Sequence, residues 1–133
     1  MILALVDDLL FRSKIREVAR RAGAEVVFAR TAADVAEAAR ARPSLAVVDL
    51  HAEKLDPLGS LAALRAEGIP AIGFFAHVQT DLARAALEAG ATEVMPRSAF
   101  AMKLPEILGA HARANGGDGV SGVRNGETGK TET

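Results

Sequence analysis

Short runs of aliphatic residues alternate along this chain with longer segments whose apolar residues recur at helical spacing. ILALV at 2–6 and LAVVDL at 45–50 are examples of the first kind, and LFRSKIREVARRA at 10–22 is an example of the second. Repeated strand–helix units are typical of a parallel sheet with helices on both faces. The expected strands are 2–6, 25–29, 45–50, 71–75 and 92–95, and the expected helices are 10–22, 32–41, 57–67, 81–89 and 99–114.

Residues with known preferences for helix ends support these boundaries. Gly23 is suited to a helix C-cap. Thr31 and Asp34 form a candidate capping pair, and Asp56 precedes a proline at the start of a helix. Pro105, inside the last helical segment, predicts a kink or a restart of that helix.

Five strand–helix units predict an α/β protein of the flavodoxin-like type. This is a doubly wound, five-stranded parallel sheet in the order 2-1-3-4-5. Ligands bind to such sheets at the carboxyl ends of the strands, near the point where the strand order reverses between strands 1 and 3. Functional side chains are therefore expected at that edge of the sheet.

Length, charge and cysteine content exclude several classes of protein. The 133 residues suffice for one compact domain but not for two. A formal net charge of −1 gives no reason to expect nucleic acid as a partner, and no apolar run approaches the roughly 20 residues of a membrane span. The absence of cysteine excludes disulfides and thiolate chemistry, and it fits a cytoplasmic protein.

The composition changes near the C-terminal end. Residues 115–133 hold six of the twelve glycines and almost no large apolar residue. Such a segment cannot bury enough surface to offset the entropy of ordering it. We therefore expect a folded domain over 1–114 and a flexible glycine-rich tail over 115–133.

Three acids lie at the ends of two predicted strands. Asp7 and Asp8 follow the first strand, and Asp49 lies near the end of the third. Since these strands are neighbours in the predicted order, the carboxylates should converge and repel one another unless a cation such as Mg²⁺ neutralises them. A plainer alternative has Asp8 capping the next helix and Asp7 in solvent. Arg97 would then balance Asp49.

This pattern resembles the receiver domain of bacterial two-component response regulators over roughly residues 1–112. In that family a pair of acids ends strand 1 and the phosphoacceptor aspartate ends strand 3, which the DD pair at 7–8 and Asp49 match. Asp56 matches the acid that starts the third helix, and EAGA at 88–91 matches the turn into the last strand. The resemblance implies the same fold, also called CheY-like, and a role in two-component signalling.

Two positions depart from the family pattern. Phe75 stands where the family has Ser or Thr, so the hydroxyl that contacts the phosphoryl group is missing. Arg97 stands where the family has Lys, and Ser98 follows it in place of a proline. The acid side of the site is therefore intact, whereas the side that reads the phosphoryl group is changed.

The resemblance implies that Asp49 accepts a phosphoryl group from a histidine kinase or a phosphotransfer protein. Asp8 and Asp49 would hold Mg²⁺ directly, and Asp7 would hold it through water. The backbone carbonyl of His51 would be the third protein ligand. Arg97 would replace the family lysine beside the phosphoryl oxygens.

The resemblance also implies a signalling domain that acts by protein contact and is not an enzyme. We expect it to stand alone, without an attached output domain. A protein partner, or a second copy of the chain, would bind the face formed by the helix at 81–89, the strand at 92–95 and the helix at 99–114. The candidate apolar anchors on this face are Leu82, Ala86, Phe100 and Leu104, although the plainer interpretation of half of them is core packing.

Two other interpretations stay open. A pseudo-receiver would use the same fold as a protein-interaction module regulated by the concentration of its partner and not by phosphate. Phe75 and Arg97 favour this interpretation. Asp7, Asp8 and Asp49 oppose it. A binder of small molecules or nucleotides on this fold has no positive motif in the sequence.

Overall fold

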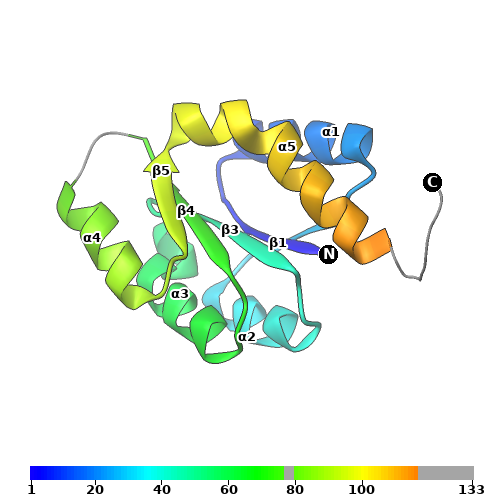
Figure 1. Ribbon diagram of the computed structural model, residues 1–133. Helices are drawn as coiled ribbons and strands as arrows, with labels where there is room; N and C mark the ends of the chain where they lie inside the picture. Colours follow the sequence, from blue (N-terminus) through cyan, green and yellow to red (C-terminus); the bar gives the residue numbers. More distant parts are fainter. Residues whose placement is uncertain (77–79, 117–133) are drawn as a thin grey trace.

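A central parallel sheet lies between two layers of helices in the computed structural model, which describes residues 1–76 and 80–116 (Figure 1). The strands are β1 (Ile2–Leu5), β2 (Val26–Phe28), β3 (Leu45–Asp49), β4 (Ala71–Phe75) and β5 (Glu93–Pro96). The helices are α1 (Leu9–Ala22), α2 (Ala32–Arg40), the short 3₁₀ helix η1 (Glu53–Leu55), α3 (Pro57–Ala66), α4 (Thr80–Ala89) and α5 (Arg97–Gly116). The strand order β2-β1-β3-β4-β5, parallel throughout, confirms the predicted flavodoxin-like topology.

The predicted helix ends are present for the predicted reasons. Gly23 adopts the left-handed conformation at the end of α1, with φ of 71°. Thr31 and Asp34 form a reciprocal capping box at the start of α2. Asp56 caps α3 by accepting the backbone N–H of Gly59. The last helix runs through Pro105 without interruption, so it does not restart there.

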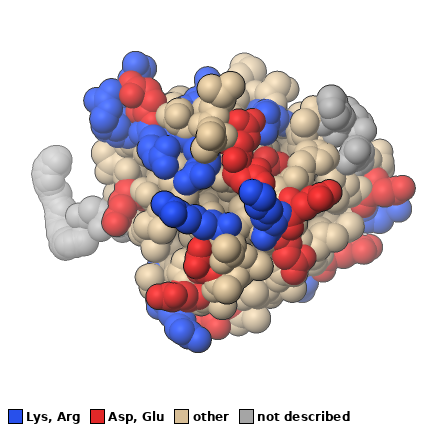
Figure 2. Space-filling model, turned by 180° about the vertical axis from the view of Figure 1, so that it is seen from behind, with Lys and Arg blue, Asp and Glu red and all other residues tan. Residues whose placement is uncertain are grey.

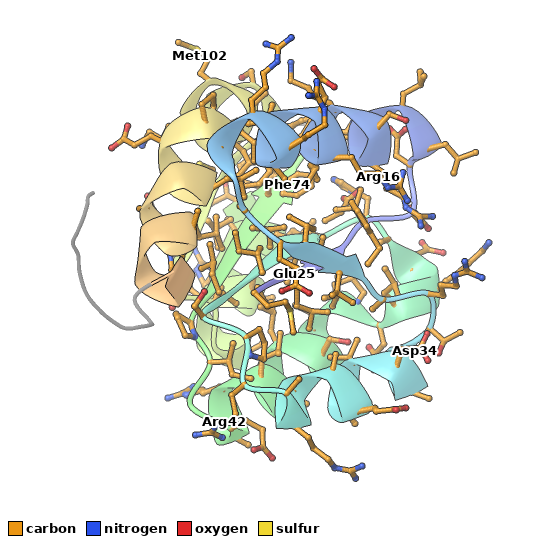
Figure 3. All side chains as sticks on the ribbon, turned by 90° about the vertical axis from the view of Figure 1, so that its right-hand side faces the viewer. Arg16, Glu25, Asp34, Arg42, Phe74 and Met102 are labelled. Carbon is orange, nitrogen blue, oxygen red and sulfur yellow. The ribbon has the colours of Figure 1, made fainter. Side chains whose placement is uncertain are left out.

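The two helical layers bury both faces of the sheet. Helices α1 and α5 cover one face, and α2, α3 and α4 cover the other (Figure 1). All five residues of β3 are buried, as expected for a central strand covered on both sides. On the α1–α5 face, the rings of Phe74 and Phe100 stack with centroids 4.6 Å apart, and Phe11 lies 5.3 Å from Phe74. Figure 3 shows Phe74 below α1.

The residues expected to anchor a partner are core residues. Ala86, Phe100 and Leu104 have no exposed surface, and Leu82 packs against the core. Core packing is therefore the correct interpretation for three of the four, and only Leu82 keeps part of its surface exposed. Helical spacing identifies an apolar stripe but not the direction in which the stripe faces. The exposed apolar residues of these two helices are others, such as Leu87 on α4 and Met102 on α5. Met102 points away from the fold in Figure 3.

The last helix extends to Gly116, two residues beyond the predicted domain boundary at 114. The remainder of the predicted tail, 117–133, lies outside the described residues. Of the helices in the described ranges, none is both long enough and apolar enough to cross a membrane.

The different environments of Phe100 and Met102 can be tested by truncation. Phe100→Ala should lower the free energy of unfolding by about 3–5 kcal/mol because it leaves a cavity in the core. Met102→Ala, at a side chain that is 84% exposed on the same helix, should change it by less than about 0.5 kcal/mol. Urea unfolding followed by far-UV circular dichroism measures both. Similar small losses for the two variants would contradict the placement of Phe100 in the core.

Candidate functional site

Two of the predicted site acids lie at the carboxyl edge of the sheet, where β1 and β3 end side by side. Asp49 is the last residue of β3 and is only 4% exposed. Asp8 follows β1 and is the N-cap of α1. These two acids converge because β1 and β3 pair in register, with Leu5 opposite Val48.

Arg97 joins the two acids. It is the first residue of α5, directly after β5. One terminal nitrogen lies 3.4 Å from Oδ2 of Asp8, and the other lies 3.5 Å from Oδ2 of Asp49. The guanidinium also lies 4.8 Å from the ring centroid of Phe11 and 5.9 Å from that of Phe74. One cation therefore pairs with both carboxylates, offsetting one of their two negative charges, while packing against two aromatic rings.

The other oxygen of each acid is bound by backbone N–H groups. Oδ1 of Asp8 accepts hydrogen bonds from the N–H groups of Leu10 and Phe11 at 3.0 and 3.3 Å. Oδ1 of Asp49 accepts one from the N–H of His51 at 2.9 Å. Each carboxylate thus has one oxygen on the backbone and one facing Arg97. A buried carboxylate is costly unless it is paired and hydrogen-bonded, and Asp49 meets both conditions.

The third predicted acid does not join this group. The Asp7 side chain is exposed, and it lines a separate cavity with Arg12, Arg30 and Lys54. The expectation that all three carboxylates converge is therefore wrong. Successive residues at the end of a strand point to opposite sides, so adjacent acids diverge.

The expected magnesium site has two of its three acids together, Asp8 and Asp49, and it stays a prediction. Within residues 1–76 and 80–116, no three acidic, histidine or cysteine residues are grouped so that they could hold a metal ion. The carbonyl oxygen of His51 accepts the N–H of Glu53 at 3.0 Å within the turn after β3. Arg97 faces the oxygens of Asp8 and Asp49 that a divalent ion would need.

Phe75 is buried away from the acids. It is 7% exposed and belongs to the core between the sheet and helices α2, α3 and α4. Arg97 packs instead against Phe74, the preceding residue, which belongs to the core beneath α1 and α5. The alternation of side chains along β4 produces this separation.

Sequence reasoning identified Asp8, Asp49 and Arg97 but missed the rings that support them. The plainer alternative, in which Asp8 caps a helix and Arg97 balances Asp49, describes their placement in the structure. One feature of the sequence could have indicated the role of Phe11. It lies three residues after the N-cap Asp8, a position that turns it toward the sheet in the first turn of α1.

Comparison with known proteins identifies the fold. No protein-family model and no curated protein matches the chain. Solved structures do match it. A response regulator from Hahella chejuensis is 20% identical, with a TM-score of 0.72, over 83% of this chain and 92% of that chain.

Two further structures agree. The phosphorylated cyanobacterial phytochrome response regulator RcpA is 21% identical, with a TM-score of 0.66, over 82% of this chain and 88% of that chain. A LuxR-family two-component response regulator from Aurantimonas sp. is 22% identical, with a TM-score of 0.67, over 85% of this chain and 84% of that chain. At these identities the likeness shows the fold, which is that of response-regulator receiver domains.

Removing the Arg97 cation tests its part in the site. Arg97→Gln should lower the free energy of unfolding by roughly 1–3 kcal/mol, because it leaves the buried Asp49 carboxylate without a positive partner. Magnesium chloride should stabilise this variant and leave the unmodified protein unchanged, relative to sodium chloride at equal ionic strength. Thermal unfolding measures both effects.

Arg84→Gln is the matched control, because Arg84 forms an exposed ion pair with Asp81. It should change stability little and should respond to magnesium as the unmodified protein does. Equal stabilisation of the unmodified protein and Arg97→Gln by magnesium would show that Arg97 does not obstruct a metal site.

Proposed function

We propose that this chain is a receiver-like signalling domain that acts through protein–protein contact, with its acid site held in one state by Arg97 independently of phosphorylation. The observation that carries the proposal is the pair of contacts from Arg97 to Asp8 and Asp49. The receiver fold supports a role in two-component signalling, and the closed acid site supports the pseudo-receiver form of that role.

The contacts of Asp49 oppose phosphoryl acceptance in the present arrangement. Transfer requires a carboxylate oxygen to approach phosphorus in line with the leaving group. Oδ1 of Asp49 is engaged by a backbone N–H, and Oδ2 faces the guanidinium. The residue is also almost fully buried. A donor could reach Asp49 only after Arg97 had left both acids.

The same contacts disfavour a divalent cation. The guanidinium of Arg97 already pairs with the two carboxylates, and a second cation at the same place would be repelled by it. Arginine is a good residue for this position because its planar group contacts two carboxylates and two rings together. It also keeps its charge at every physiological pH.

Protein contact is the proposed output. Leu87 on α4 is 49% exposed and Met102 on α5 is 84% exposed, so apolar surface is available on both helices. On the opposite side of the molecule, which is turned away in Figure 1 and shown in Figure 2, Lys and Arg side chains are interspersed with Asp and Glu, so that side offers no continuous basic surface. A partner protein, or a second copy of the chain, fits these features better than nucleic acid does.

Phosphoryl acceptance on Asp49 is the second candidate function. It is favoured by the placement of Asp8 and Asp49 at neighbouring strand ends, as the resemblance to receiver domains requires. In this candidate a histidine kinase or phosphotransfer protein is the donor, Mg²⁺ is the cofactor, and Arg97 swings aside.

Labelling with acetyl phosphate distinguishes the two functions. The unmodified protein, incubated with acetyl phosphate and magnesium, should gain no phosphoryl group by intact mass. Arg97→Lys restores the family residue, and its compact ammonium contacts fewer groups, so it should label at least about tenfold faster. Asp49→Asn in the Arg97→Lys background should abolish the label.

Rapid stoichiometric labelling of the unmodified protein would replace the first proposal with the second. Labelling that survives Asp49→Asn would place the acceptor elsewhere.

A further inference from the structure

A cavity of about 430 Å³ lies at the carboxyl ends of β1 and β2, separate from the pair of acids held by Arg97. Asp7, two residues beyond the end of β1, and Arg30, two residues beyond the end of β2, line it. Arg12 from α1 and Lys54 from η1 complete its charged lining. We propose that this cavity binds a small phosphate ester.

The charges of the cavity are not neutralised from within. In the part of the chain that the structure describes, the side chains of Arg12, Arg30 and Lys54 form no ion pair and no side-chain hydrogen bond. Nε of Arg12 is buried without a hydrogen-bond partner among those residues. Three cations therefore share one cavity with one acid, Asp7, which lies beyond ion-pairing distance of them. This balance favours an anionic ligand with more than one negative charge.

One of the three cations is held before any ligand arrives. The guanidinium of Arg12 lies 5.0 Å from the ring centroid of Phe28. The side chains of Arg30 and Lys54 are exposed, so a ligand would order them on binding. The segments that carry them are fixed, because the backbone N–H of Arg30 donates to Oδ2 of Asp34 at 3.1 Å and Leu55, next to Lys54, is 1% exposed.

A phosphate ester fits both the charged and the uncharged parts of the lining. Guanidinium groups bind phosphate oxygens with two parallel hydrogen bonds, and a lysine adds a point charge. Asp7 would repel a second anionic group but can accept hydrogen bonds from a hydroxyl of the same ligand. The exposed side chain of Leu9 supplies an apolar wall for a carbon skeleton.

The size and place of the cavity are also appropriate. Small-molecule sites measure about 300–1,000 Å³, a range that includes this cavity. Open α/β sheets bind their ligands outside the carboxyl ends of the strands. The sequence contains no motif for a small-molecule binder, the third interpretation considered above. This cavity is a structural feature that supports that interpretation.

Isothermal titration calorimetry of the full chain with ribose 5-phosphate at low ionic strength tests the proposal. We expect saturable binding of ribose 5-phosphate, weaker binding of inorganic phosphate and no binding of ribose. Each of Arg12→Gln, Arg30→Gln and Lys54→Gln should raise the dissociation constant about tenfold, because each removes one charge-assisted contact. The triple variant should abolish binding. Failure of ribose 5-phosphate to bind at millimolar concentration would overturn the proposal.

Matched control variants separate the cavity from general surface charge. Arg16→Gln removes the other cation over the Phe28 ring, 4.6 Å from its centroid, and Arg16 does not line the cavity. Arg40→Gln and Lys103→Gln each remove one exposed charge elsewhere. These three variants should bind as the unmodified protein does. Equal weakening by control and cavity variants would mean that the phosphate senses only net charge, and the proposal would fail.

Two further variants test the assigned roles. Asp7→Asn should tighten binding of inorganic phosphate, because Asp7 repels it. The same variant should reduce the preference for ribose 5-phosphate over inorganic phosphate, because Asp7 accepts a hydrogen bond from the hydroxyl of the ester. Equal effects on the two ligands would overturn that assignment. Asp49→Asn should leave the affinity for ribose 5-phosphate unchanged. A loss of binding in Asp49→Asn would place the ligand at the acid site and overturn the separate cavity.

Discussion

The guanidinium of Arg97 lies between the carboxylates of Asp8 and Asp49 and against the rings of Phe11 and Phe74. These contacts join the end of β3, the capped start of α1 and the first residue of α5. They therefore fix the two helices that cover one face of the sheet at the edge where those helices begin. They also make it possible to bury Asp49 at the end of a strand that has no exposed residue.

The pairing of Arg97 with the two acids gives one explanation for both departures from the receiver pattern, Arg97 and Phe75. In the proposed arrangement, with arginine in place of lysine, one guanidinium pairs with both acids, and neither a metal ion nor a phosphoryl group binds there. A hydroxyl on β4 would then have no phosphoryl group to contact, and Phe75 at that position contributes to the core between the sheet and α2, α3 and α4. The retained acids and the changes at Phe75 and Arg97 thus belong to a single arrangement in which Arg97 pairs with both acids.

The fold could be predicted from the sequence because each buried strand is a continuous apolar run and each helix has a recognisable end. Gly23, the Thr31–Asp34 pair and Asp56 cap their helices as their residue types favour. The order of the predicted strands brings Asp8 and Asp49 together, and the resemblance to receiver domains identifies Arg97 beside them.

Other features could not be predicted because they depend on direction and on distant contacts. A helical stripe does not reveal which way it faces, so the sequence alone does not distinguish docking from core packing for Phe100 and Leu104, which are buried. Asp7 and Asp8 are adjacent in sequence, yet Asp7 lines the cavity and Asp8 pairs with Arg97. The cavity at the ends of β1 and β2 draws Arg12, Arg30 and Lys54 from three separate segments, and no local motif indicates it.

A crystal structure grown with magnesium and beryllofluoride, a mimic of the phosphoryl group, tests the central claim most directly. The account predicts that Arg97 still bridges Asp8 and Asp49, with no adduct on Asp49 and no metal beside it. An adduct on Asp49, with magnesium bound by Asp8 and Arg97 displaced into solvent, would contradict it.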